Sequence, residues 1–121
     1  MPQRFSKQAI GALGERIVSD ALAQRGYQTL ARNERTRFGE VDLVVKREDT
    51  VLFVEVKTRT DRSFGAPEEA IDHRKRLRMS KTATALADKF AQECDWALLV
   101  VAVELDLTNK TARLRRIELD D

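Results

Sequence analysis

Residues 40–59 read EVDLVVKREDTVLFVEVKTR. Two valine-rich runs, at 40–47 and 51–58, lie on either side of a short polar segment, and this pattern predicts a β-hairpin. The apolar residues of both runs are nearly continuous, so we expect both strands to be largely buried in a sheet. A two-residue turn at Glu48 and Asp49 would set the register of the hairpin.

The charged residues of this hairpin are the candidates for chemistry. In the register of a two-residue turn, Asp42 lies opposite Glu55 and Glu40 lies opposite Lys57. Glu55 and Lys57 share a face because side chains alternate along a strand. Opposed carboxylates repel and are costly to bury, unless one is protonated, a lysine lies between them or a cation binds both. The cation would be a hard ion such as Mg²⁺ or Mn²⁺, with Lys57 beside it. Alternatively, these charges belong to a solvated strand face.

The rest of the chain predicts an α/β fold with the element order α-β-β-β-α-β-β. The flanking segments are expected to be, in chain order, a helix at 7–25, a strand at 27–32, a helix at 67–93 and strands at 96–107 and 111–119. Ser6 is the expected N-cap of the first helix, and Pro67 is the expected first residue of the second. Leu77 is expected on the inner face of the second helix, against the sheet. The prediction is a single domain over 1–121, with a mixed five-stranded sheet flanked by helices.

Composition narrows the class of protein. The chain has 121 residues, of which 42% are hydrophobic and 35% charged, as in an ordinary globular domain. Its longest apolar run, 96–103, is far shorter than the ~20 residues that span a bilayer, so we expect no membrane association. Cys94 is the only cysteine, which excludes a disulfide framework within the chain and a multi-cysteine zinc site. The cytoplasm is therefore the expected compartment.

Charge is distributed unevenly along the chain. The sequence holds 22 Lys and Arg residues against 20 Asp and Glu residues, but the basic excess lies in 1–81 and the acidic excess in 82–121. This asymmetry indicates an anionic partner for the first two thirds of the chain.

Longer motifs resemble the YraN-like family of small bacterial proteins. The resemblance covers about residues 11–90 and rests on GALGE at 11–15, NERTRFGEVDLV at 33–44, VLFVEVKTR at 51–59, Phe64-Gly65, Glu69-Ala70-Ile71 and Lys75. That family has the restriction-endonuclease-like PD-(D/E)xK fold and is similar to archaeal Holliday junction resolvases. The resemblance implies a metal-dependent endonuclease for DNA, with branched or junction DNA as the expected substrate and RNA as an open alternative. A homodimer is expected by the same analogy.

The resemblance also implies roles for individual residues. Asp42 and Glu55 are implied as ligands of Mg²⁺ or Mn²⁺, Lys57 as the catalytic lysine and Glu15 as a further acidic catalytic residue. Glu15 lies at the edge of the apolar stripe of its helix, directed either toward the sheet rim or into solvent. Glu40 is expected to support the ligands or to pair with Lys57. Sequence-independent contacts to nucleic-acid phosphates are expected from Arg35, Arg37, Arg59 and Lys75.

Three functions stay open at this point. The first is the metal-dependent nuclease, and the second is a nucleic-acid-binding module that keeps the fold without turnover. The third is an assembly protein in which the hairpin charges are incidental. A pure binding module has no need of opposed carboxylates, so the pattern favours the nuclease.

Overall fold

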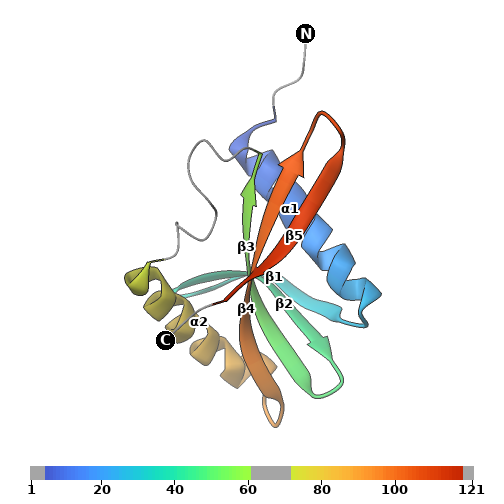
Figure 1. Ribbon diagram of the computed structural model, residues 1–121. Helices are drawn as coiled ribbons and strands as arrows, with labels where there is room; N and C mark the ends of the chain where they lie inside the picture. The colour runs from blue at the N-terminus through green and yellow to red at the C-terminus, as the bar shows by residue number, and fades with distance from the viewer. Residues whose placement is uncertain (1–4, 61–71, 119–121) are drawn as a thin grey trace.

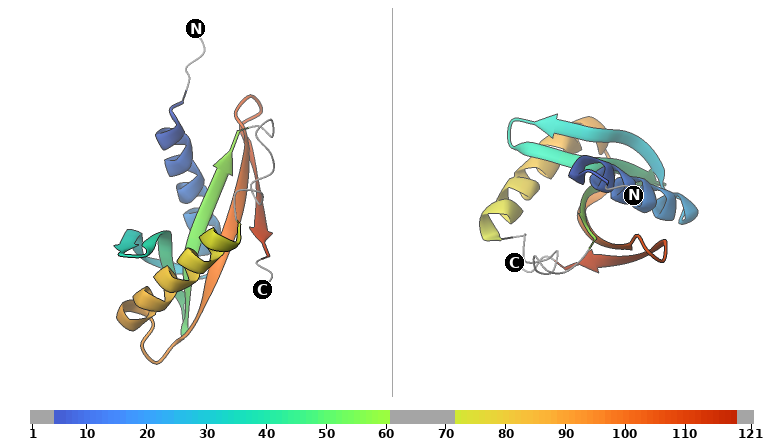
Figure 2. Two further views of the ribbon diagram at one scale, coloured as in Figure 1. Left: turned by 90° about the vertical axis from the view of Figure 1, so that its left-hand side faces the viewer. Right: turned by 90° about the horizontal axis from the view of Figure 1, so that it is seen from above.

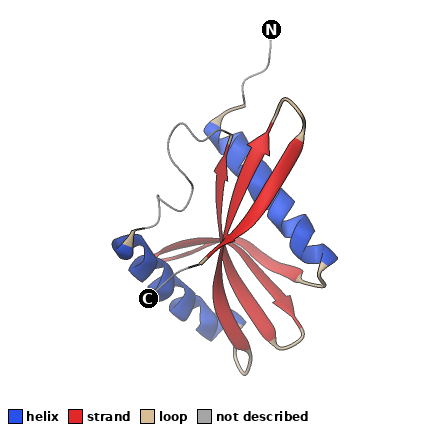
Figure 3. Cartoon of the chain, in the orientation of Figure 1, coloured by secondary structure: helices blue, strands red, loops and turns tan. Residues whose placement is uncertain are grey.

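The computed structural model describes residues 5–60 and 72–118, and its elements follow the predicted order (Figure 1). They are α1 (Lys7–Gln24), β1 (Gln28–Thr36), β2 (Gly39–Arg47), β3 (Thr50–Arg59), α2 (His73–Phe90), β4 (Asp95–Asp106) and β5 (Thr111–Ile117). Within the described residues the strands form one five-stranded sheet in the order β1-β2-β3-β4-β5 (Figure 3). Only β3 and β4 are parallel, so the predicted mixed α/β sheet is confirmed.

The predicted hairpin register is confirmed near its turn. Val44 pairs with Phe53 and Arg47 with Thr50, leaving Glu48 and Asp49 as the turn. Glu48 has a φ of 53°, a left-handed conformation that tight hairpin turns require.

Beyond the pair of Leu43 and Val54, β2 and β3 part. β2 continues beside β1 as far as the pair of Thr36 and Gly39, whereas β3 continues beside β4. Figure 1 shows this fork, where the tip of the β1–β2 hairpin turns away from β3. The predicted ladder pairs of Asp42 with Glu55 and of Glu40 with Lys57 therefore do not form, because β2 stays beside β1 where it leaves β3.

The two helices pack on opposite faces of the sheet. Val18 and Leu22 of α1 join a core cluster with Val54, whereas Ala83 and Leu86 of α2 join a second cluster around Phe53. The two faces follow from alternation along β3. Seen from above, the sheet curls around α1, with β1 and β2 on one side of that helix and β5 on the other (Figure 2). Neither described helix is long and apolar enough to cross a membrane.

The helix starts were predicted with different success. Ser6 caps α1 as expected, since its hydroxyl accepts the Ala9 amide at 3.0 Å. The described second helix, α2, begins at His73, and the predicted start at Pro67 lies outside the described residues. Asp72 is its N-cap, with an extended backbone that a continuous helix could not contain. The helix also ends at Phe90, short of the predicted Glu93.

The inner face of α2 and two strands also differ from the prediction. Leu77 is 49% exposed, whereas Met79 and Ala83 of the same helix are buried against the sheet. Leu77 lies two residues before Met79, so its side chain points away from the sheet. β1 extends beyond the predicted residues 27–32 to Thr36, because β2 pairs with it along its whole length. Trp96 is 40% exposed, so β4 is covered on both faces only in its later part.

Candidate functional site

Asp42 occupies the fork between β2 and β3. Its Oδ2 accepts a hydrogen bond from the Val56 amide at 2.7 Å. The side chain thus supplies the acceptor that β2 would have supplied had the ladder continued, and buried backbone amides need such a partner. This bond ties the Asp42 carboxylate to β3 beside Glu55.

Several acidic groups converge on this carboxylate. Burial, the nearby Glu55 carboxylate and, less strongly, Glu15 together raise the pKa of Asp42 to about 7, against the opposing effects of the Val56 amide and Lys57. Mutual repulsion of this kind is typical of carboxylates that share a binding site. The raised pKa values of Asp42 and Glu15 mark this fork as a candidate functional site.

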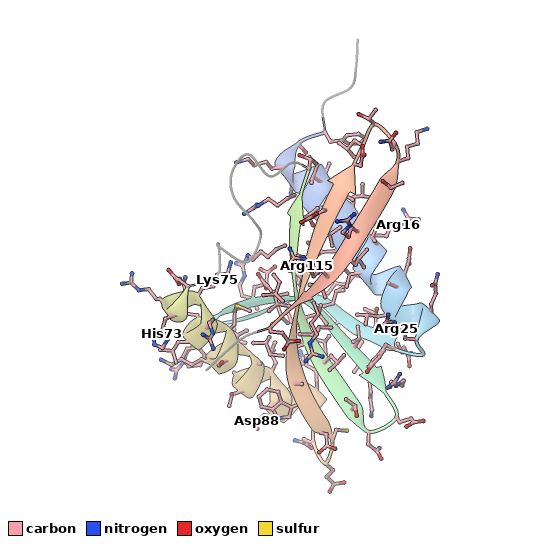
Figure 4. All side chains as sticks on the ribbon, viewed as in Figure 1. Arg16, Arg25, His73, Lys75, Asp88 and Arg115 are labelled. Atoms are coloured by element: carbon pink, nitrogen blue, oxygen red, sulfur yellow. The ribbon has the colours of Figure 1, made fainter. Side chains whose placement is uncertain are left out.

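Two lysines neutralise Glu55. The Nζ atoms of Lys57 and Lys75 lie 3.2 Å and 3.9 Å from the same Glu55 Oε1. The side chains of Glu55 and Lys57 are only 13% and 17% exposed, so water screens these charges little. Burial and the neighbouring Lys57 lower the pKa of Lys75 to about 8. Figure 4 labels Lys75 at the N-terminal end of α2, where the Asp72 side chain holds its amide at 2.8 Å.

Glu15 approaches the fork from α1. Burial raises the pKa of the half-buried Glu15, and the Glu40 and Glu55 carboxylates raise it further, while Arg32 opposes them. The preceding Gly14 brings α1 against β3, since a Cβ at that position would lie 2.9 Å from the Thr58 Cβ. The glycine therefore permits the close helix–strand contact that carries Glu15 to the site.

Glu40 has a different partner from the one predicted. Its Oε2 lies 3.2 Å from Nη2 of Arg35, and its expected partner Lys57 pairs with Glu55 instead. The reason is the fork, which carries Glu40 away from β3 together with β1.

The four cations predicted to contact phosphate fall in different places. Lys75 lies beside Glu55, whereas Arg35 is engaged with Glu40 on an exposed part of β1. Arg37 stacks over the ring of Phe38, with its guanidinium carbon 4.7 Å from the ring centroid. Arg59 lines a separate open hollow of about 620 Å³ at the far ends of β3 and β4, so the structure does not bring it to the hollow that contains Glu55.

The donor set suits a hydrated divalent ion better than a fully caged one. Within residues 5–60 and 72–118, no three His, Cys, Asp or Glu side chains form a ready cluster for a metal. Mg²⁺ is usually bound by one or two carboxylates and keeps several waters. Asp42 and Glu55 could provide that pair, and a bound cation would relieve the repulsion from Glu55 that helps to raise the pKa of Asp42.

Sequence reasoning missed residues that complete the hollow in front of Glu55. This open hollow of about 250 Å³ is lined by Phe38, Glu40, Glu55, Lys75, Arg78 and Thr82. Phe38 belongs to the hairpin tip and Thr82 to α2, which come together only through tertiary packing. The aromatic residue next to Arg37, within the motif at 33–44, was the available signal.

Comparison with known proteins assigns the family. The family model described as Uncharacterised protein family UPF0102 matches residues 14–115. The chain belongs to UPF0102. A UPF0102 protein of Alkaliphilus oremlandii is 35% identical over 111 residues, which are 90% of this chain and 94% of the relative. A second, from Trichlorobacter lovleyi, is 45% identical over 100 residues, or 81% and 79% of the two chains.

The UPF0102 match confirms the resemblance to the YraN-like family and extends it beyond residue 90, into β5. Among solved structures, the chain is similar to a repair endonuclease from Pyrococcus abyssi, with a TM-score of 0.50 and 16% sequence identity. That similarity covers 88% of this chain and 42% of the endonuclease chain. It shows that this UPF0102 chain shares its fold with that chain, and the mixed α/β sheet and element order are those predicted.

Proposed function

We propose that this protein is a divalent-metal-dependent endonuclease that hydrolyses phosphodiester bonds in DNA. The observation that supports it most is the arrangement at the fork, where Asp42 bonds to the Val56 amide and Glu55 lies against Lys57. Two partly buried carboxylates and a lysine beside a polar hollow are suited to phosphodiester hydrolysis.

Each residue at the fork has a role in this proposal. Asp42 and Glu55 hold Mg²⁺ or Mn²⁺, which when bound supplies Lewis-acid activation of the scissile phosphate. Lys57 then orients the attacking water and stabilises the negative charge that develops on the phosphate. Glu15 extends the acidic group from α1, and Glu40 supports it from β2 while it restrains Arg35.

Recognition of the substrate is proposed to depend on its backbone. Lys75 contacts a phosphate at the hollow, with Arg35, Arg37 and Arg59 as further cationic contacts along the strand ends. Phosphate contacts give affinity that depends on salt and little on sequence. Branched or junction DNA is the proposed substrate, and RNA is the alternative that the same contacts allow. A homodimer would bring two such sites to one junction. Light scattering with and without a four-way junction tests this by measuring the molar mass of the protein and of its complex.

One observation favours a second candidate, a nucleic-acid-binding module without turnover. Lys57 and Lys75 already neutralise Glu55 in the ligand-free chain, so the buried carboxylate does not require a metal. Asp42→Ala separates the two candidates. In a pure binding module it preserves or strengthens DNA affinity, with no cleavage to lose.

The deciding experiment is a cleavage assay with Mn²⁺ and Mg²⁺ on labelled four-way junction, flap, single-stranded and duplex DNA. Glu55→Gln and Lys57→Met remove the proposed chemistry with little change of shape. Asp20→Asn, an exposed carboxylate on α1, is the matched control. Cleavage that is lost in the first two variants and kept in the third supports the nuclease. The nuclease is rejected if all variants keep the cleavage, or if neither the wild-type protein nor any variant cleaves.

A further inference from the structure

At the tip of the β1–β2 hairpin, two cationic side chains lie over the ring of Phe38. The Arg37 guanidinium carbon lies 4.7 Å from the ring centroid, and the Lys81 Nζ lies 5.9 Å from it. Arg78, one helical turn before Lys81 on α2, lines the same hollow as Phe38. That hollow also contains Glu55 and Lys75, so the ring that Arg37 and Lys81 contact lines the candidate site.

The charges around the ring are not balanced. Within the described part of the chain, neither Arg37 nor Lys81 forms an ion pair, although the hairpin holds Arg35 and Glu40 together nearby. Two cations on one aromatic ring repel each other, and the attraction of the ring for each offsets this only in part. An anion bound between them would remove the repulsion.

The ring also prepares the cations for an anion. A guanidinium that stacks on an aromatic face keeps the N–H groups at its edge free, and these match a phosphate in a two-point contact. Holding Arg37 and Lys81 against Phe38 reduces the rotamer freedom that they would otherwise lose on binding. Because Arg37 and Lys81 both lie over the ring, these cations take the place of a stacked base.

We propose that Phe38, Arg37 and Lys81 form a clamp for a backbone phosphate of the nucleic acid, separate from the phosphate at Lys75. Lys81 follows Lys75 by six residues, or about 9 Å along an α-helix. Successive phosphates of one strand in duplex DNA advance by about 3.4 Å along the helix axis. The clamp therefore takes a different phosphate from the one at Lys75, and the strand passes from the N-terminal end of α2 to the hairpin tip. The inference specifies the path of the substrate and rests on the proposed function for its identity.

The test measures binding without cleavage. Fluorescence anisotropy of a labelled single-stranded and a labelled duplex oligonucleotide is recorded in EDTA over a range of salt concentrations. Arg37→Ala and Lys81→Ala are each expected to lower the slope of log affinity against log salt by about 1, the change expected for one lost phosphate contact. Lys110→Asn, a charge removal in the turn between β4 and β5, is the matched control and should leave the slope unchanged.

The role of the ring is tested separately. Phe38→Leu keeps an apolar side chain but removes the aromatic face, so it should weaken binding in the same direction as loss of Arg37 or Lys81. Phe38→Trp keeps an aromatic face, so its slope of log affinity against log salt should equal that of wild type. Melting temperatures of all variants show that each is folded. The clamp is overturned if the slopes for Arg37→Ala and Lys81→Ala equal the slope for Lys110→Asn. It is also overturned if Phe38→Leu binds like wild type.

Failure of the clamp and failure of the nuclease are distinguishable. A wild-type protein that cleaves DNA, with clamp variants that bind as tightly as Lys110→Asn, rejects the clamp and leaves the nuclease standing. A wild-type protein that never cleaves, yet shows the expected loss of slope in the clamp variants, rejects the nuclease and leaves the phosphate contact standing.

Discussion

The Asp42 carboxylate accepts the Val56 amide at 2.7 Å, so a side chain completes the hydrogen bonding of β3 at the point where the neighbouring strand leaves. This one bond satisfies a backbone donor and holds an ionisable group at the mouth of the fork. Asn at position 42 would keep the acceptor and lose the charge, whereas Ala would lose both. Asp42→Asn is therefore the variant that isolates the role of the charge.

The ligand-free protein should lose stability as pH rises through the titration of Asp42. Its pKa is raised from 3.8 to about 7 in the folded protein, so between these values the folded state binds a proton that the unfolded state has released. This contribution to the free energy of unfolding is full below about pH 4 and is lost by about pH 7. Asp42→Asn should remove it. We expect the variant to gain stability relative to wild type as pH rises from 5 to 7.5, by about 1–3 kcal/mol.

Urea unfolding in EDTA at several pH values measures this difference, with Asp20→Asn as the control. A difference between Asp42→Asn and wild type that stays constant with pH would show that Asp42 titrates normally.

Mn²⁺ or Mg²⁺ should stabilise the folded protein, and more strongly at pH 8 than at pH 6. Metal binding needs the deprotonated carboxylate, and the pKa of Asp42 of about 7 lies between the two pH values. A metal at 100 times its Kd adds about 2.7 kcal/mol to the free energy of unfolding. Thermal unfolding with and without metal measures the shift, which Asp42→Asn and Glu55→Gln should abolish. An equal shift in those variants would place the metal elsewhere.

Gly14→Ala should be destabilising and should impair the candidate site. Its Cβ would meet the Thr58 side chain, and overpacking of this kind costs about 1–3 kcal/mol. The displaced helix carries Glu15 with it, so cleavage should fall by more than the loss of folded protein explains. Gly11→Ala is the matched control, because nothing lies within 4 Å of a Cβ there and alanine favours the helix. Equal stability and activity of the two variants would refute the close-contact role of Gly14.

DNA binding in EDTA should weaken as pH rises through about 8. Burial and Lys57 lower the pKa of Lys75 to that value, so its ammonium is charged below pH 8 and increasingly neutral above it. Lys75→Arg keeps the charge throughout this range and should remove the pH dependence, since arginine does not deprotonate there. Anisotropy titrations from pH 7 to 9.5 compare the two proteins. Parallel pH profiles would exclude Lys75 as the titrating contact.

The parts of the fold that the sequence predicted are those set by local pattern. The hairpin turn at Glu48, the Ser6 cap and the element order follow from residues close together in the chain. The fork was missed because it depends on β4 pairing with β3, a contact between distant segments. The continuous helix predicted from Pro67 was wrong because Asp72, whose side chain accepts the Lys75 amide, is the N-cap of α2 and has an extended backbone.

The candidate site was predictable to a similar extent. The sequence placed Glu55 and Lys57 on one face, and the structure brings them within ion-pair distance. The contacts of Phe38 could not be predicted, because Lys81 reaches its ring only after α2 docks against the hairpin. The partner of Glu40 was mispredicted for the reason that the fork was missed.

The parallel pairing of β3 with β4 has a consequence for how the molecule assembles. Two-residue turns join β1, β2 and β3, whereas the pair of Thr50 and Asp95 closes a loop of about 45 residues, which costs more entropy and slows folding. The three-stranded meander, with Asp42 and Glu55 on it, should thus gain protection from hydrogen exchange before α2 brings Lys75 and Lys81 into place. The part of the site that β2 and β3 carry should then be built first, and the lysines of α2 should arrive second.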